Sequence, residues 1–467
     1  MMPIPLWLMS NAVAAMEVQG AHVPEGPING ISIDSRTVRR DDLFFAILGD
    51  QLDGHDYVQK ALAAGARAAV VSRPIAGVGD DKLLLVDDTL EALNKLGIAA
   101  RARSHAKIIA ITGSVGKTGT KEALSLALEH CGQTHAAVAS FNNHWGVPLT
   151  LARCPAQSDL GIFEIGMNHP GEITPLVKMV RPHIVIITNV APVHLMYFKS
   201  VDEIAKAKAE IFSGLEPGGT AILNRDNSYF DFLSDAAHEA GVAKVVSFGE
   251  HSEADVRLVS YSLEAGKSLV KIDMMGQSIT YETGAPGKHL ALNSLSVMAA
   301  VKEVGGDVKL AASALAHWQA PVGRGAKHIL KIGDNSAVLI DETFNANPTS
   351  MRAALSTLAS AVPEGGGRRL AVLGDMLELG ATTVELHRDL LKPIEDAAVH
   401  QVYAIGPDMK HLWDDLPENM KGSYAPNAQA MKEILLRAVK PGDIVMIKGS
   451  KGTKLGPLVD ALLTHFG

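Results

Sequence analysis

The segment Thr112–Thr118, with the sequence TGSVGKT, combines two glycines, a lysine and three hydroxyl side chains within seven residues. Glycines at this spacing let backbone N–H groups close around a phosphate, while Lys117 can reach the terminal phosphates and Thr118 can meet Mg²⁺. Ile111 stands where the common phosphate-binding loop has its first glycine. The loop is therefore shortened, but an apolar strand precedes it and a helical pattern follows it. This setting favours nucleotide binding over a chance glycine-rich turn.

A carboxylate and an imidazole follow two later apolar runs. Glu164 ends the run that begins at residue 160, and His194 comes shortly after the run 183–190. Ligands of open α/β sheets bind outside the carboxyl ends of the strands. Carboxylate and imidazole side chains at that edge are able to hold a metal ion. The alternative is a helix cap for Glu164 and an ordinary loop residue for His194.

Cationic side chains form the third group of candidates. Lys206 and Lys208 lie two positions apart in a helical pattern, so they point to different sides of the helix. Arg324 lies in the glycine-rich junction 321–325, where closing domains could bring its charge to a phosphoryl group. Lys448 follows a strand end and is a further basic candidate. The alternative for Lys206 and Lys208 is a solvated cation, and the alternative for Arg324 is an ordinary surface arginine.

The elements that must position these residues divide the chain into three domains, as its length of 467 residues suggests. Residues 31–71 read as strand, turn, strand, loop, helix and strand. Residues 106–325 alternate apolar strands with helices, which predicts a parallel sheet covered on both faces, although the polar stretch 245–283 looks antiparallel. The strand-helix pattern restarts beyond 326 in a Rossmann-like form. We expect domains at 1–105, 106–325 and 326–467.

Composition excludes several classes of protein. A formal net charge of −8 and a pI near 6.1 argue against a general nucleic-acid binder. Cys131 and Cys154 cannot form a disulfide framework, which favours a reducing compartment. The apolar residues 1–16 have no basic n-region and predict a short amphipathic helix. Other apolar runs are too short to span a membrane. We expect a monomeric cytoplasmic protein without membrane insertion that acts on small molecules.

The shortened loop resembles the ATP loop of the Mur ligases and of the related folylpolyglutamate synthetase. Further segments resemble the MurF branch of that family, and they are SFNNHWGVPLTL (140–151), EIGMNHPGEI (164–173), NVAPVHL (189–195), AKAKAEIF (205–212), DETFNANPTSM (341–351) and LGDMLELG (373–380). The resemblance implies an α/β fold of three domains. A central parallel-sheet ATPase domain of P-loop type would lie between a small α/β UDP-binding domain and a Rossmann-like C-terminal domain.

The resemblance also implies a reaction of cell-wall synthesis. With ATP and Mg²⁺, such an enzyme ligates D-alanyl-D-alanine to UDP-N-acetylmuramoyl-tripeptide through an acyl phosphate and produces the UDP-muramoyl pentapeptide of peptidoglycan synthesis. An alternative is a MurE-type ligase, which adds the third amino acid, but the chain has no DNPR-like segment in its last domain. Another alternative is a nucleotide-binding scaffold without catalysis.

Roles transfer from the family to matching positions of this chain. The implied catalytic residues are Lys117, Glu164, His194, Lys208 and Arg324. The implied nucleotide contacts are Gly113, Ser114, Val115, Gly116, Lys117, Thr118, Gly119, Asn293, Arg324 and Asp341. The implied substrate contacts are Ser35, Arg36, Asn142, Asn143, Asn345, Asn347 and Lys448. The implied Mg²⁺ ligands are Thr118, Glu164, His194 and Lys208, the last as a carbamate, which presents oxygens of the kind that Mg²⁺ prefers.

The chain departs from the family pattern at two places. Residues 195–199, LMYFK, follow His194 where the family usually has Glu-Gly-Phe-Gly. Gly119 stands where threonine is usual, and glycine in a helix costs about 1 kcal/mol relative to alanine. The first departure concerns substrate contacts near His194, and the second concerns only the first turn of a helix.

Overall fold

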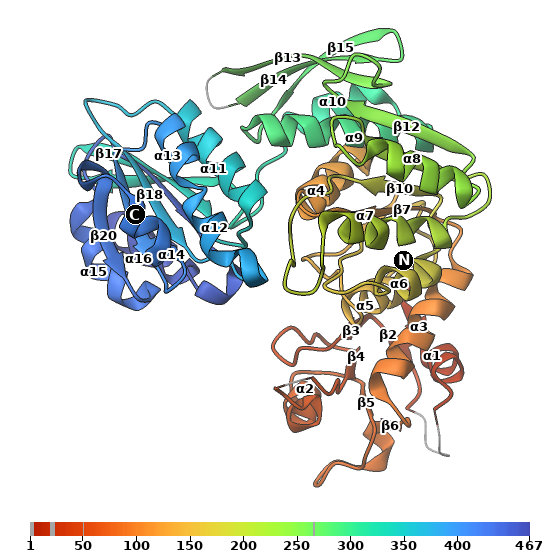
Figure 1. Cartoon of the computed structure of the whole chain (residues 1–467). Coiled ribbons are helices and arrows are strands. Elements are labelled where there is room, and N and C mark those ends of the chain that lie inside the picture. The colour runs from red at the N-terminus through yellow and green to blue at the C-terminus, as the bar shows by residue number, and fades with distance from the viewer. Residues whose placement is uncertain (1–3, 19–23, 50, 265–266) are drawn as a thin grey trace.

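The computed structural model describes residues 4–18, 24–49, 51–264 and 267–467. The chain forms three α/β parts, each built on its own main sheet (Figure 1). The first part (red to orange) lies below the central part (yellow to green), and the third part (cyan to blue) lies beside them. The three-domain α/β fold expected from the sequence is confirmed.

The first part contains a four-stranded, all-parallel sheet in the order β3-β4-β5-β6. Its strands are β3 (Gly30–Ser32), β4 (Asp42–Phe45), β5 (Ala68–Val71) and β6 (Leu83–Leu85). A two-stranded sheet precedes it, formed by β1 (Trp7–Leu8) and β2 (Pro27–Ile28), and the helices are α1 (Met9–Met16), α2 (Val58–Ala63) and α3 (Thr89–Arg103). The expected N-terminal helix is α1. Residues 1–3 of that segment lie outside the described residues.

The central sheet has nine strands in the order β15-β14-β13-β12-β11-β10-β7-β9-β8. They are β7 (Lys107–Thr112), β8 (Thr134–Ala136), β9 (Leu160–Glu164), β10 (Ile184–Ile187), β11 (Thr220–Asn224), β12 (Lys244–Gly249), β13 (Val256–Glu264), β14 (Lys267–Met274) and β15 (Gln277–Thr283). The region 245–283 is antiparallel only from β13 onward. The expectation was wrong for β12, which pairs parallel to β11 because a helical crossover connects these two strands.

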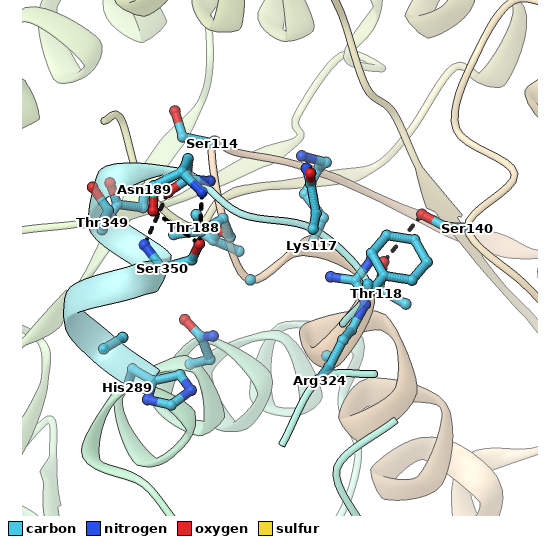
Figure 2. Close-up of a pocket in the computed structure, with 18 of the residues that line it drawn as sticks. Ser114, Lys117, Thr118, Ser140, Thr188, Asn189, His289, Arg324, Thr349 and Ser350 are labelled. Carbon is cyan, nitrogen blue, oxygen red and sulfur yellow. Dashed lines mark hydrogen bonds between the residues drawn. The ribbon is translucent and has the colours of Figure 1, made fainter. Parts of the chain in front are cut away.

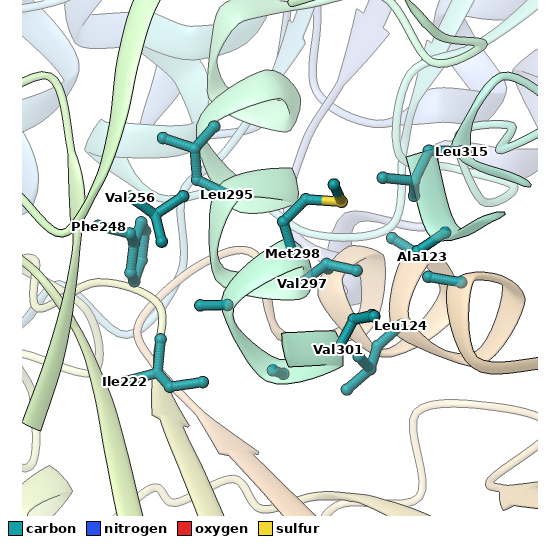
Figure 3. Packing of buried hydrophobic residues seen from close by; sticks show 14 of the residues in the cluster. Ala123, Leu124, Ile222, Phe248, Val256, Leu295, Val297, Met298, Val301 and Leu315 are labelled. Carbon is teal, nitrogen blue, oxygen red and sulfur yellow. The ribbon is translucent and has the colours of Figure 1, made fainter. Parts of the chain in front are cut away.

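Helices cover both faces of the central sheet. They are α4 (Lys117–Leu128), α5 (Gly146–Ala152), α6 (Ile173–Val180), α7 (Val201–Ala209), α8 (Phe230–Glu239), α9 (Lys288–Val304) and α10 (Val308–Leu315). Figure 3 shows α9 packed between the sheet residues Ile222 and Phe248 on one side and α4 on the other. The helical pattern that carries Lys206 and Lys208 forms α7, which ends at Ala209 and passes into a 3₁₀ turn over Glu210–Gly214.

The third sheet has the order β16-β17-β21-β18-β19-β20. Its strands are β16 (Ala326–Ile332), β17 (Asn335–Glu342), β18 (Arg369–Gly374), β19 (Gln401–Ile405), β20 (Lys421–Ala425) and β21 (Ile444–Lys448). The helices are α11 (Pro348–Ser360), α12 (Thr383–Arg388), α13 (Leu391–Asp396), α14 (Met409–Asp415), α15 (Ala428–Ala438) and α16 (Gly456–Phe466). The strand-helix alternation expected beyond residue 326 is present in β17, β18, β19 and β21, and β16 and β20 are added at the two edges of the sheet.

The topology brings the candidate residues to shared sheet edges. Strands β10, β7 and β9 are parallel neighbours, so the segments after their carboxyl ends lie together. These segments carry His194, the phosphate-loop sequence and Glu164. In the described part of the chain, no helix combines the length and the apolarity that crossing a membrane requires.

Candidate active site

A cavity of about 360 Å³ lies between the central sheet and the third domain. Figure 2 shows the phosphate-loop residues together with Arg324 and with Thr349 and Ser350 at the start of α11. The predicted site residues that line this cavity are Ser114, Val115, Gly116, Lys117, Thr118, Gly119, Asn142, Glu164, His194, Asn293, Arg324, Asn345, Asn347 and Lys448. The structure therefore brings together residues that lie more than 300 positions apart in the sequence.

The phosphate loop is held in one conformation by the segment that follows β10. The N–H of Ser114 donates to the carbonyl of Asn189 at 2.8 Å, and Thr188 Oγ1 donates to the carbonyl of Val115 at 2.5 Å. Gly113 approaches Thr188 so closely that an added Cβ would lie 2.0 Å from Thr188 Oγ1. The glycine at this position is thus required by a close approach of backbone to side chain.

Lys117 begins α4 and reaches back over the loop. Its Nζ donates to the carbonyl of Gly113 at 2.5 Å. Burial lowers the pKa of Lys117, while the carboxylate of Glu164 opposes that shift. The ammonium group is therefore placed at the loop that would surround a phosphate.

Three side chains donate hydrogen bonds to the carboxylate of Glu164. Thr118 Oγ1 lies 2.9 Å from Oε2, while Ser140 Oγ lies 3.0 Å and Asn142 Nδ2 lies 2.6 Å from Oε1. Glu164 is buried at the end of β9, so these bonds compensate for lost hydration. The sequence analysis missed Ser140. Its signal was its position at the start of the segment SFNN, which also contains Asn142.

The two candidate lysines of α7 differ sharply in environment. Lys206 is exposed, whereas Lys208 is 2% exposed. Burial and the neighbouring charge of Lys117 lower the pKa of Lys208 well below its usual value. Among the residues that the structure describes, none forms a hydrogen bond or ion pair with the Lys208 side chain. Lys208 lies outside the lining of the cavity.

His194 lies in the loop between β10 and α7 and lines the same cavity. Its Nδ1 is 2.5 Å from Oε2 of Glu378, a residue of the third domain. This hydrogen bond lowers the pKa of the Glu378 carboxyl group. The imidazole thus connects the central domain to the third domain.

Two cationic side chains line the cavity on the side of the third domain, Arg324 from the interdomain linker and Lys448 from the end of β21. The guanidinium of Arg324 lies 3.7 Å from the centre of the Phe344 ring, and burial lowers its pKa. Lys448 Nζ donates to Glu342 Oε2 at 3.1 Å and to the carbonyl of Asn345 at 2.9 Å. These contacts hold two positive charges near the phosphate loop.

Two predicted contacts of the third domain have other partners. Asp341 is outside the cavity lining, and its carboxylate accepts from the N–H groups of Gly323 at 3.1 Å and Thr343 at 3.0 Å. Asn347 lines the cavity, but its side chain also caps α11 by accepting from the N–H of Ser350 at 2.9 Å. Asp341 thus fastens the interdomain linker to the third sheet.

A larger cavity of about 1190 Å³ lies between the first domain and the central domain. Ser35 and Arg36 line it, as expected, together with the aromatic pair Phe141 and Trp145. Asn143 lines neither cavity, because its side chain accepts from the N–H of Gly146 at 3.0 Å at the start of α5.

Models of three families match most of the chain. They are the Mur ligase family, catalytic domain (residues 27–80), the Mur ligase middle domain (111–301) and the Mur ligase, glutamate ligase domain (330–451). The UDP-N-acetylmuramoyl-tripeptide--D-alanyl-D-alanine ligase of Rickettsia prowazekii is 36% identical over 92% of this chain and 94% of its own length. The enzyme of that name from Escherichia coli is 32% identical, with 96% and 95% covered.

Solved structures give the same result. MurF from Acinetobacter baumannii has a TM-score of 0.85 and 28% identity, with 99% of this chain and 100% of that chain covered. A Thermotoga maritima MurF ligase in complex with ADP shares the fold with a TM-score of 0.76 at 24% identity, covering 93% and 97%. With a relative 36% identical over nearly its whole length, the chain belongs to the Mur ligase family.

Proposed function

We propose that this chain ligates D-alanyl-D-alanine to UDP-N-acetylmuramoyl-tripeptide at the expense of ATP and produces the UDP-muramoyl pentapeptide. The observation that carries the proposal is the cavity in which the phosphate loop, Glu164 and the basic residues of the third domain meet. The relatives that match over nearly their whole length are named for this activity. A MurE-type activity has less support, since the MurE-type structure, a diaminopimelate-adding ligase, matches at only 16% identity.

ATP would bind with its phosphates in the loop 113–118. Lys117 and Arg324 are positioned to neutralise negative charge as the terminal phosphoryl group moves. Side-chain amides such as Asn293 line the same cavity and supply polar contacts for the rest of the nucleotide. Most of the catalysis would come from positioning and from fixed charges, as in phosphoryl transfer generally.

The donor set next to the loop fits Mg²⁺. The Thr118 hydroxyl and the Glu164 carboxylate are hard oxygen ligands 2.9 Å apart, and substrate phosphates and water usually supply the other ligands of this ion. The described residues hold no group of three or more His, Cys, Asp and Glu side chains that would suit a metal by itself, which agrees with a site shared with substrate. Mg²⁺ would supply charge neutralisation at the phosphates.

Carbamylation of Lys208 is consistent with the environment of its side chain. A carbamate forms when a neutral amine attacks CO₂, and burial beside Lys117 favours the neutral amine. The attack releases a proton and leaves an anion, which the cation of Lys117 would attract. The carbamate would also supply an oxygen ligand for Mg²⁺, the role that the family resemblance assigns to it.

The acceptor would occupy both cavities. Its uridine diphosphate would lie in the larger cavity near Ser35 and Arg36, and its peptide would extend toward Lys117. The terminal carboxylate attacks the terminal phosphorus of ATP, and ADP leaves. The amine of D-alanyl-D-alanine then attacks the acyl carbon, and phosphate leaves as the amide bond forms. We place Asn345, Asn347 and Lys448 on the side of the incoming dipeptide.

We propose a monomer as the active form, because the phosphate loop, Glu164 and Lys448 of a single chain already meet in one cavity. We also propose the cytoplasm as the location of the enzyme. The cytoplasm provides ATP, and a reducing compartment suits the two free thiols, Cys131 and Cys154.

Product analysis by mass spectrometry tests the assignment. Purified enzyme, ATP and UDP-muramoyl tripeptide should release phosphate and form pentapeptide only when D-alanyl-D-alanine is added. In a parallel reaction, UDP-muramoyl dipeptide and meso-diaminopimelate should give no ligation product. Equal turnover in both reactions would refute the assignment.

A further inference from the structure

Glu378 is the residue through which the third domain reaches the loop that carries His194. Its carboxylate lies 2.5 Å from His194 Nδ1, and its carbonyl accepts from the N–H of Met196 at 3.0 Å. The backbone of Gly380 lies against the same loop, where an added Cβ would be 3.3 Å from the carbonyl oxygen of Leu195. A side-chain bond and a backbone bond thus join two domains at one residue.

Both partners of this contact have left-handed backbones. The φ angle is +55° at His194 and +64° at Glu378. Residues other than glycine rarely adopt such angles, which are strained and persist where surrounding contacts enforce them. The observed contact therefore joins two loops that are each held in an uncommon conformation.

The loop that presents Glu378 is itself fixed within the third domain. The N–H of Met376 donates to His387 Nε2 at 3.0 Å, and the N–H of Leu377 donates to Ser450 Oγ at 2.9 Å. Both acceptors belong to other segments of the third domain. Glu378 therefore moves with the third domain as a whole.

The carboxylate determines which nitrogen of His194 is available. A carboxylate beside Nδ1 holds a proton there and leaves the lone pair of the neutral ring on Nε2. Nε2 makes no hydrogen bond with any described residue, and the ring lines the cavity next to the phosphate loop. The Nε2 lone pair is thus free to serve as a ligand or as a hydrogen-bond acceptor.

We propose that Glu378 is a positioning residue, which sets the tautomer and orientation of His194 only when the third domain is docked. Docking of the domain that receives the dipeptide would then complete the phosphoryl-transfer site. This inference rests on the proposed function for its catalytic consequence. Its structural part does not depend on the proposed function. This part is the pair of hydrogen bonds that joins Glu378 to His194 and Met196, which we call the latch.

Two variants of Glu378 distinguish the effect of side-chain length from the effect of side-chain charge. Glu378→Asn shortens the side chain by one methylene and suits a left-handed backbone, so it removes the side-chain bond to His194 without added strain and leaves the backbone bond to Met196 without that support. Glu378→Gln keeps the length and an acceptor oxygen but removes the charge. Glu385→Gln is the matched control, because Glu385 is an exposed glutamate of the same domain without a described side-chain partner.

Hydrogen exchange of the ligand-free protein tests the latch. A peptide that contains Met196 should exchange about 10- to 150-fold faster in Glu378→Asn, since a hydrogen bond to a charged group is worth about 1.5–3 kcal/mol and each 1.4 kcal/mol is a factor of ten. Glu378→Gln should give an intermediate rate, and Glu385→Gln should match the wild type. An unchanged rate in Glu378→Asn overturns the latch, whichever substrates the enzyme uses.

Kinetics test the catalytic consequence. The kcat of Glu378→Asn should fall about 10- to 100-fold, as losses of such orienting carboxylates do, while the KM for ATP changes much less. In a His194→Ala background, Glu378→Asn should cause little additional loss. An equal loss in both backgrounds overturns the positioning role, even if exchange at Met196 confirms the contact. Failure of D-alanyl-D-alanine ligation in the wild type would instead refute the proposed function.

Discussion

Replacement of Gly116 by alanine adds a single carbon atom to the phosphate loop and tests whether the loop requires glycine at this position. The φ angle of Gly116 is +88°, and an added Cβ would lie 2.7 Å from Asn293 Nδ2. A left-handed backbone costs a residue with a side chain about 1–2 kcal/mol, and alanine regains about 0.4–1 kcal/mol by restricting the unfolded chain. The backbone alone should therefore reduce stability by about 1 kcal/mol.

The new methyl group has a second effect, which is local to the cavity. It must displace the amide of Asn293, and inserting a methyl group into a packed site costs about 1–3 kcal/mol. Because both residues line the cavity, we expect this cost to appear as a loss of ATP affinity. At about 1.4 kcal/mol for each factor of ten, the loss is about five- to 150-fold.

Gly276 provides the matched control. Its φ angle is +86°, but an added Cβ would find no atom within 4 Å. Gly276→Ala should therefore lower thermal stability as Gly116→Ala does, while calorimetric titration with a non-hydrolysable ATP analogue gives wild-type affinity. Wild-type affinity in Gly116→Ala, or an equal loss in both variants, would refute the reasoning.

Three further outcomes are expected. Lys117→Ala should abolish turnover with unchanged circular dichroism, because it removes the cation that contacts the phosphate loop, and near-normal turnover would contradict the phosphate role. Lys208→Ala should lose most activity and regain part of it with a short carboxylic acid, whereas exposed Lys206→Ala should remain active; a fully active Lys208→Ala enzyme would eliminate the carbamate. Burial lowers the pKa of His387 from 6.5, so below pH 6.5 the unfolded chain binds a proton that the folded chain excludes, and the free energy of unfolding decreases as the pH is lowered. His387→Gln should make this decrease smaller in unfolding measurements at several pH values. An unaltered pH dependence would exclude His387 as its cause.

Local sequence patterns were sufficient for the buried parallel strands. The run IIAIT is largely apolar and lies between Lys107 and Gly113, and the strand expected before the phosphate loop is β7, Lys107–Thr112. The edge strands β16 and β20 have partly exposed residues and no apolar run, so their pattern resembled loops. The pairing of β12 depends on a crossover connection, which residue alternation does not encode.

In the candidate site, too, the sequence predicted the residues that depend on neighbouring positions and missed those that depend on distant ones. Lys117 and Thr118 follow from the loop sequence, because a phosphate loop needs only neighbouring residues. Ser140 contacts a carboxylate 24 residues away, and Glu378 contacts an imidazole 184 residues away, so the chain's fold alone brings them together. Asp341 was predicted to contact nucleotide, and its carboxylate also accepts from the N–H groups of Gly323 and Thr343, contacts that no local pattern indicates.

The distribution of apolar cores has a consequence for how the molecule melts. Leu149 and Ala152 of α5 belong to the core that contains α3, so the first and central domains share one interior. The cores of the third domain draw only on residues beyond 329. Heating should therefore give two calorimetric transitions rather than three. A ligand that bridges the 360 Å³ cavity should raise both transitions, whereas a ligand confined to the larger cavity should raise only one.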